Sequence, residues 1–202
     1  MIRNEIGIQV SRIFPTSVYT VDCSFLLESV EKVLNQYKDK DEKWTISPQN
    51  RSSLSKEVLN DHLEVKEYIE TVVNGCLQEW KYELPLKMSS SWFTRTSKGR
   101  SIDSHFHCNS LWSAVFYFED SSSLVLLSDN VPAIYIKSKA PANVLSYGSV
   151  EMAAKKGSMI IFPSSLSHAS KKNKLNEDRY SLAMNFMPFG KIEHSDSAYD
   201  YR

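Results

Sequence analysis

The sequence predicts an α+β protein in which N-terminal helices cover one face of a β-rich jelly roll or sandwich. In the first part of the chain, apolar residues recur every three to four positions, as on one face of an amphipathic helix. Beyond Pro85 the apolar period changes to two, in short runs bounded by Gly, Pro, Asp and Ser, which is typical of strands and turns. Two helices followed by several short strands favour this layered architecture.

Length and charge indicate one domain that acts on a small partner. The chain has 202 residues, enough for one substantial core but short for two ordinary domains. We expect a single domain, 1–202, with a strand plus helices (1–84), a jelly-roll sheet (85–190) and a tail (191–202). Because 24 basic and 24 acidic residues cancel to a net charge of +0, no overall field favours nucleic acid or anionic membranes. The expected partner is therefore a small molecule or a neutral surface.

Cysteine usage and hydropathy favour a cytoplasmic setting. The three cysteines form no CxxC pair, which argues against a disulfide framework and a Cys-rich zinc site. The N-terminus has no apolar core of the signal-peptide type, and no apolar run is long enough to span a bilayer. We expect no membrane association. The composition is compatible with a homodimer and does not decide the oligomeric state.

The N-terminal elements are predicted in order along the chain. The run 8–21 mixes β-branched residues with Pro15, which suits an edge strand because proline cannot donate a ladder hydrogen bond. A helix over 25–37 follows, with Ser24 as its N-cap. A second helix carries an apolar stripe from Val65 to Trp80, and Asp61 with Glu64 resembles a capping box at its start. We interpret the stripe as the face packed on the core.

The remaining chain reads as strands up to about residue 189, with a loosely packed polar tail from residue 191. The predicted strands are 86–96, 105–119, 124–129, 133–136, 144–152, 158–162, 168–170 and 179–187.

Three histidines in two of these strands form a candidate metal site. In a strand, residues i and i+2 project from the same face, so His105 and His107 would present two imidazoles to one point. His168 lies far enough along the chain to return as a third ligand from a neighbouring strand. Imidazoles bind iron, zinc, copper and nickel alike, so the histidines do not identify the metal.

A candidate carboxylate site follows the last of these histidines. A polar run after His168 leads into an apolar strand that begins at Arg179, which predicts a hairpin that brings Arg179 back beside the metal. Arg179 and Ser181 share a strand face, so a guanidinium and a hydroxyl group could together bind a carboxylate. A charged side chain on an inward-facing strand is costly unless it has a partner, and a bound carboxylate would be such a partner.

Together these motifs resemble the 2-oxoglutarate/Fe(II) oxygenases found in bacteria and their phages. The resemblance rests on the His-x-His pair with 110–113 (SLWS), on 157–164 (GSMIIFPS) leading to His168, and on Arg179-x-Ser181; it spans most of the chain. It implies a double-stranded β-helix and iron held by a His, a carboxylate two residues later and a distal His. Here His107 takes the place of the carboxylate. A three-histidine site, a carboxylate from Asp103, or a site that no longer binds iron tightly are the alternatives, and we favour three histidines.

The same resemblance implies the cofactors and the reaction. Fe(II) and 2-oxoglutarate would hydroxylate an unknown small molecule or peptidyl side chain, with release of succinate and CO2, in the cytoplasm or, for a phage gene, the host cytoplasm. The far carboxylate of 2-oxoglutarate would pair with Arg179 and Ser181. Tyr117, on the strand parity of His105, is expected to add a hydrogen bond, with Asn109 and Asn185 lining the pocket.

Two other kinds of function remain open from the sequence. The first is a cupin-like metal-binding protein with a sensing or structural role and no turnover. The second is a metal-dependent oxygenase without 2-oxoglutarate, such as a thiol dioxygenase, in which Arg179 would bind the carboxylate of the substrate. The loops 97–104 and 120–138, together with the N-terminal helices, are expected to decide substrate specificity.

Overall fold

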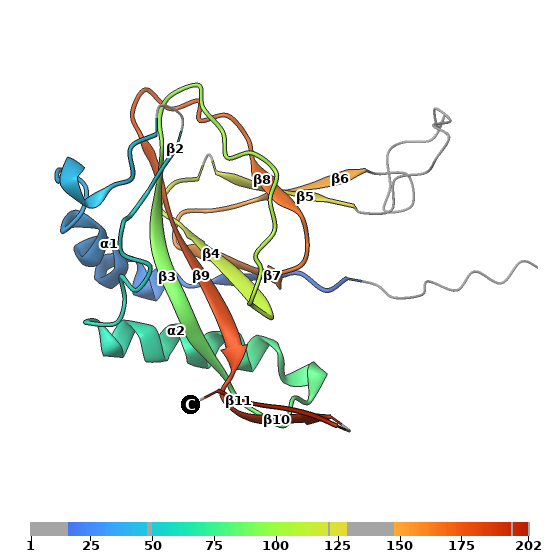
Figure 1. The fold of residues 1–202 in the computed structure, drawn as a ribbon. Coiled ribbons are helices and arrows are strands. Elements are labelled where there is room, and N and C mark those ends of the chain that lie inside the picture. The colour runs from blue at the N-terminus through green and yellow to red at the C-terminus, as the bar shows by residue number, and fades with distance from the viewer. Residues whose placement is uncertain (1–15, 48–49, 121, 129–147, 195, 202) are drawn as a thin grey trace, which may run out of the picture.

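The computed structural model describes residues 16–47, 50–120, 122–128, 148–194 and 196–201. Two antiparallel sheets form its centre (Figure 1). The large sheet has the order β1 (Tyr19–Asp22), β7 (Ser158–Pro163), β4 (Trp112–Tyr117), β9 (Arg179–Pro188), β3 (Leu86–Thr96) and β2 (Asn50–Ser52). The small sheet has the order β6 (Ser149–Ala153), β5 (Ser123–Leu127) and β8 (His168–Ser170). The fold is the predicted double-stranded β-helix, with helices on one face.

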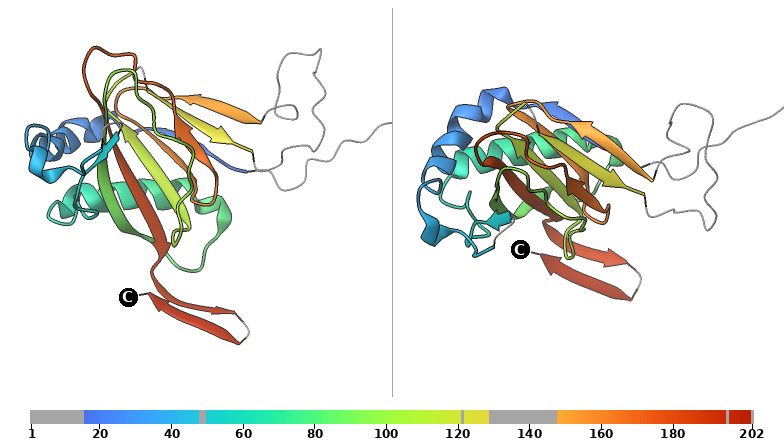
Figure 2. Two further views of the ribbon diagram at one scale, coloured as in Figure 1. Left: turned by 45° about the horizontal axis from the view of Figure 1, so that its top comes forward. Right: turned by 90° about the horizontal axis from the view of Figure 1, so that it is seen from above.

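The helices α1 (Leu27–Asn35) and α2 (Leu63–Cys76) cover one face of the large sheet, as Figures 1 and 2 show. Because side chains alternate between the two faces of each strand, the large sheet contributes to two separate hydrophobic cores. Phe116 packs with the helices, whereas its neighbours Val115 and Tyr117 pack with the small sheet. Because the apolar side chains of both faces are buried, the large sheet is rigid, and side chains on its inner face have well-defined positions.

Both helices begin differently from the predictions. Three short 3-10 turns, η1 (Ser24–Leu26), η2 (Asp41–Lys43) and η3 (Gln78–Trp80), accompany them. Ser24 is not an N-cap: it opens η1, where its N–H donates to the Asp22 carboxylate at 2.9 Å. At α2 the N-cap residue is His62 and makes no side-chain capping bond, so the Asp61–Glu64 capping box is wrong. Sequence spacing identified the helices, but the capping groups depend on how the chain enters them.

The strand predictions are confirmed where alternation is strong. β3 has the predicted bounds, and β1 is an edge strand. The prediction for 105–119 is wrong in its first half, since β4 begins at Trp112 and the residues before it are irregular. The predicted strand 133–136, the start of 144–152 and the start of 8–21 with Pro15 lie outside the described residues.

Two further differences concern the C-terminal part. The tail forms a hairpin of β10 (Gly190–His194) and β11 (Ser197–Tyr201) instead of a frayed end. β8 and β9 do not form a hairpin, because β8 pairs with β5 in the small sheet and β9 lies between β4 and β3 in the large one. The chain between them passes from one sheet to the other. Among the described residues, no helix is long and apolar enough to cross a membrane.

Candidate active site

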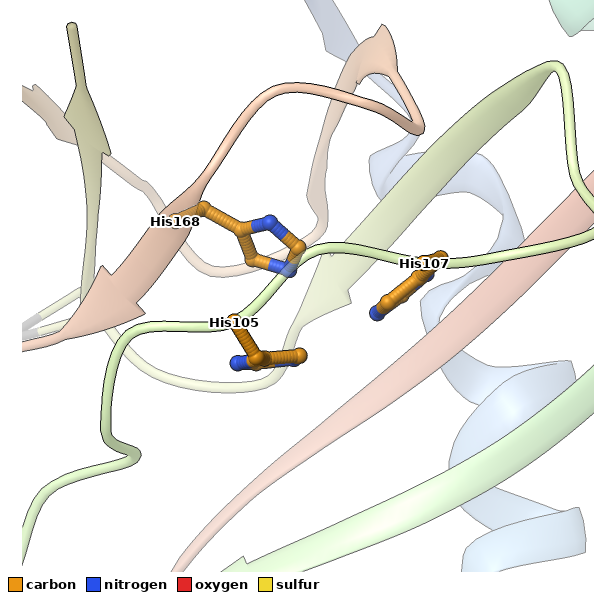
Figure 3. A group of neighbouring side chains, drawn as sticks. All are labelled: His105, His107 and His168. Carbon is orange, nitrogen blue, oxygen red and sulfur yellow. The ribbon is translucent and has the colours of Figure 1, made fainter. Parts of the chain in front are cut away.

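Three imidazole rings meet between the two sheets. One nitrogen from each of His105, His107 and His168 lies within 4.8 Å of the other two. The ring centroids are 4.3 to 5.3 Å apart, and Figure 3 shows the rings around a common space. Such a group of nitrogen atoms can bind one metal ion.

The first two histidines do not owe their positions to strand alternation. They lie in the irregular segment that precedes β4. This segment, and not β4, runs beside β8. The N–H of His105 donates to the carbonyl oxygen of His168 at 3.0 Å, and the reciprocal bond is 2.8 Å. The N–H of His107 donates to the carbonyl oxygen of Ser164 at 2.9 Å. Hydrogen bonds to the small sheet and to the loop before it therefore place both rings.

Each ring is held through Nδ1. The Nδ1 atoms of His105 and His168 lie 2.9 Å from the carbonyl oxygens of Asp103 and Leu166. Nδ1 of His107 lies 2.6 Å from Oδ1 of Asn185 and 2.9 Å from Oγ of Ser113. Because a carbonyl or amide oxygen only accepts hydrogen bonds, each Nδ1 carries the proton and each Nε2 has a free lone pair. This pattern of outer partners is the one that orients metal-binding histidines.

Burial favours the neutral form of two of the rings, those of His107 and His168. His168 is 4 % exposed, and desolvation lowers its pKa to about 4. Desolvation also lowers the pKa of His107, while its bond to Asn185 opposes the shift. Since a metal ion binds only the neutral imidazole, these two rings do not have to lose a proton first near neutral pH.

The alternative ligand Asp103 and the neighbouring Cys108 both stay outside the cluster. Asp103 is exposed, and it contributes its backbone carbonyl oxygen to His105 instead of its carboxylate to the cluster. Cys108 is also exposed and is not part of the group. In the described part of the chain, the cluster consists of imidazoles alone.

A cavity of about 240 Å³ opens beside the three rings. Alternate residues of three neighbouring strands line its floor, because alternate side chains of a strand share a face. These residues are Trp92, Thr94 and Thr96 of β3, Val115 and Tyr117 of β4, and Arg179, Ser181 and Ala183 of β9. The small sheet forms the opposite wall, mainly through residues of β8 and the start of β5.

Arg179 is a buried cation in this cavity. It is 6 % exposed, and its Nη2 donates to Oγ of Ser170 at 3.0 Å and to the carbonyl oxygen of Lys171 at 2.9 Å. No carboxylate of the described residues forms a salt bridge with it. Burial lowers its pKa, although nearby Glu119 and Tyr117 oppose this shift. A buried guanidinium without a salt-bridge partner among the described residues is suited to bind an anion.

Two hydroxyl groups flank this guanidinium. Ser181 lies opposite Tyr117 on β4 and opposite Thr94 on β3. Its Oγ lies 2.5 Å from Oγ1 of Thr94. Burial raises the pKa of Tyr117, so its phenol stays protonated and can donate a hydrogen bond. Arg179, Ser181 and Tyr117 thus present donors at one end of the cavity.

The two predicted asparagines lie elsewhere. Asn185 is not part of the cavity lining, but it holds His107 from behind and accepts a hydrogen bond of 2.9 Å from Ser113. Asn109 is exposed, adopts a φ of 54° in the turn before β4 and is absent from the cavity lining. The left-handed conformation that asparagine tolerates accounts for its place in that turn.

The sequence reasoning missed Ser170, Thr94 and Trp92. Ser170 is two residues after His168 on β8, so strand parity could have placed its side chain beside the histidine. Thr94 and Trp92 lie on β3, which has no motif that marks it as part of a site. The Trp92 ring lies 5.3 Å from the ring of His107, a contact that only the folded sheet creates.

Comparisons with known proteins agree with this geometry. Residues 90–185 match the model of a family described as "Putative 2OG-Fe(II) oxygenase". This match includes all three histidines and the arginine, so the resemblance to 2-oxoglutarate/Fe(II) oxygenases is confirmed. A search of curated proteins by sequence finds no match.

Several solved structures share the fold. The carbocyclase SnoK from nogalamycin biosynthesis is 13 % identical, with a TM-score of 0.60 over 87 % of this chain and 81 % of that one. HygX from Streptomyces hygroscopicus, solved with nickel and 2-oxoglutarate, is 14 % identical, with a TM-score of 0.54 over 86 % and 83 %. A Pseudomonas putida prolyl-4-hydroxylase is 13 % identical, with a TM-score of 0.54 over 86 % and 93 %. At these identities the likeness establishes the fold.

Proposed function

We propose that this chain is an Fe(II)- and 2-oxoglutarate-dependent oxygenase that hydroxylates a small molecule or a peptidyl side chain. One observation carries the proposal: a single cavity joins three imidazoles to a buried guanidinium that forms no salt bridge with the described residues. The first group of residues suits a divalent metal ion, and the second suits the far carboxylate of a dicarboxylic cosubstrate.

The residues present fit both groups. Each Nε2 is available as a metal ligand, because every Nδ1 already has a hydrogen-bond partner. Three neutral ligands leave the charge of Fe(II) uncompensated. Dianionic 2-oxoglutarate would offset that charge, so a cluster of imidazoles alone, as found among the described residues, favours tight binding of an anionic cosubstrate. The match to the oxygenase family supports iron over the other metals that imidazoles accept.

The strands set the distance between the two ends of the cavity. Ala183 and Arg179 lie on the same face of β9, four residues apart, which corresponds to about 13 Å of strand. The long arginine side chain and an extended five-carbon diacid together span a distance of this order. We therefore place the cosubstrate along β9, with Arg179, Ser181 and Tyr117 around its far carboxylate.

When bound, iron and 2-oxoglutarate supply the oxidation: one oxygen atom of dioxygen enters a substrate C–H bond, the other enters succinate, and CO2 is released. The protein holds the reactants and excludes water. Apolar side chains such as Val115, Leu124 and Ala183 line the cavity between its polar groups. His105 is exposed and marks the open side, where a primary substrate would approach.

Hydroxylation is the reaction we propose, although structural neighbours include an epimerase and a carbocyclase. Hydroxylation requires no hydrogen donor from the protein after the substrate C–H bond is broken, whereas epimerisation requires a donor that returns hydrogen to the carbon.

We further propose that the chain acts as a single cytoplasmic domain without nucleic-acid or membrane partners, because its charge is balanced and its cysteines are few.

The test is anaerobic binding followed by turnover. Fe(II) and 2-oxoglutarate should together produce a charge-transfer absorption, and admission of oxygen should produce succinate slowly without a primary substrate. Arg179→Ala should abolish both signals at the same cosubstrate concentration. Metal binding without 2-oxoglutarate binding would contradict the proposal and favour a cupin-like role, and oxygen consumption with a thiol alone would favour a thiol dioxygenase.

A further inference from the structure

The hydroxyl group of Ser170 touches both ends of the candidate site. Its Oγ accepts hydrogen bonds from Nη2 of Arg179 at 3.0 Å and from the N–H of Ile102 at 2.9 Å. An oxygen of this kind has two lone pairs, so these two donors use its whole accepting capacity. The side chain therefore joins a residue of the cosubstrate end to the segment that carries His105.

The segment from residue 99 to residue 107 follows β8 and the turns beside it by a series of backbone bonds. The N–H of Ser170 donates to the carbonyl oxygen of Ile102 at 3.0 Å, which makes the contact between these residues reciprocal. His105 and His168 form the next reciprocal pair. The Ser170 hydroxyl is the only side-chain group in this ladder that also contacts the arginine, among the bonds of the described residues.

His105 depends on this ladder more than the other two ligands do. It is the exposed member of the cluster, and no regular strand carries it. The Nδ1 atom of its ring hydrogen-bonds to the carbonyl oxygen of Asp103, which belongs to the same irregular segment. A shift of Ile102 would therefore move both the backbone and the outer hydrogen-bond partner of His105.

We propose that Ser170 is a positioning residue that holds Arg179 for the cosubstrate carboxylate and, through Ile102, holds His105 for the metal. This inference rests on the proposed function of the cavity. Its hydroxyl links the two ends, so loss of the hydroxyl weakens both metal binding and 2-oxoglutarate binding, although Ser170 is neither a metal ligand nor the main carboxylate partner.

The matched variants Ser170→Thr and Ser170→Val test the hydroxyl separately from the volume. Both β-branched residues suit a strand and have nearly the same shape, but only threonine keeps the oxygen atom. Two affinities are measured: that of Co(II) without cosubstrate, from its ligand-field absorption, and that of 2-oxoglutarate at saturating Co(II), by calorimetry. Ser181→Ala serves as a comparison, since its hydroxyl contacts only the carboxylate end.

Ser170→Val should raise the Kd of 2-oxoglutarate by about tenfold and that of Co(II) by about threefold, because hydrogen bonds to a charged group and to the backbone are lost. Ser170→Thr should stay within about twofold of the wild type in both. Ser181→Ala should weaken only 2-oxoglutarate binding. Circular dichroism and the Tm establish that each variant is folded, and Ser170→Ala replaces the valine variant if that one does not fold.

The inference is overturned if the valine variant changes only one affinity or neither, or if threonine is as harmful as valine. These results leave the wild-type affinities intact and hence the proposed function. A wild-type protein that binds neither Co(II) nor 2-oxoglutarate would instead remove the proposed function, and this inference with it.

Discussion

The two ends of the cavity are built by different means. The carboxylate end consists of residues in regular strands of the large sheet. Arg179 and Ser181 of β9 pair with Thr96 and Thr94 of β3, and Ser181 also pairs with Tyr117 of β4. At the metal end, His105 and His107 stand on an irregular segment, and His168 stands on a strand of only three residues. The first end is positioned by a sheet and the second by individual hydrogen bonds.

This difference shows where each end is vulnerable. A regular sheet distributes its strain over many ladder bonds, so removal of one side chain affects mainly the contacts of that side chain. Rings held by one or two hydrogen bonds depend on partners that lie outside the metal cluster. The metal end should therefore respond to changes outside the cavity, whereas the carboxylate end should respond mainly to its own side chains.

Removal of a metal ligand has the largest expected effect. His168→Ala should lower the affinity for Co(II) by more than about 100-fold, beyond the loss typical of an outer partner, and should abolish turnover. Metal titration of the purified protein measures the change. The control is His62→Ala at the start of α2, which should bind Co(II) as the wild type does. Tight binding by the His168 variant would show that the three rings are not the metal site.

Loss of the arginine should follow in magnitude. Arg179→Ala should raise the Kd of 2-oxoglutarate by about 100-fold, because a buried carboxylate would lose its charged partner. The affinity for Co(II) alone should change by less than about tenfold, since Ser170 keeps its bond to Ile102. Calorimetry measures both constants.

A suitable control for this variant is Arg95→Ala, because Arg95 instead forms a salt bridge with Asp178 and does not line the cavity. It should leave 2-oxoglutarate binding unchanged. Equal losses in the two arginine variants would mean that overall charge, and not the position of the guanidinium, attracts the cosubstrate.

Asn185 tests the contrast most directly, because it acts on the metal end from outside the cavity. Asn185→Leu removes the oxygen that orients His107, and it should lower Co(II) affinity by about 10-fold to 100-fold. Asn185→Asp keeps an acceptor at the same position and should restore most of that affinity. If leucine had no effect, the metal end would be as robust as the carboxylate end.

The smallest expected effect concerns pH and a carboxyl group near the arginine. Burial raises the pKa of Glu119 to about 7, against the lowering effects of the Tyr180 N–H, Arg179 and Lys38, while Glu177 adds to the rise. The folded protein thus binds a proton that the unfolded chain, with a carboxyl pKa near 4.5, has released. The stabilisation is present below pH 4.5 and is lost as pH rises through about 7.

Glu119→Gln removes this dependence. The variant should match the wild type at about pH 4 and should be more stable by about 1 kcal/mol at about pH 8. Urea unfolding at both values measures the difference. An equal difference at the two values would show that Glu119 titrates as an ordinary exposed carboxyl group and that the carboxylate end has no buried acid.

Much of the fold was predictable because its signals are local. The period of two along β3 and β9 and the period near four along α2 are properties of neighbouring residues, and the structure agrees with them. The error at 105–119 has a physical cause. Alternation continues through His105 and His107 by coincidence of sequence, but the chain there bonds to β8 and Ser164 instead of joining the large sheet.

The sequence by itself determined the candidate groups and their order: two histidines, a third, then an arginine and a serine that share a strand face. Only the tertiary structure decided what orients each ring, how Arg179 reaches the cavity without a hairpin, and that Ser170 touches both ends. The physical reason is the distance along the sequence over which each kind of interaction acts. Alternation acts between adjacent residues, whereas a hydrogen-bond partner such as Asn185 or Ser170 lies on another strand and meets its donor only when the sheets close.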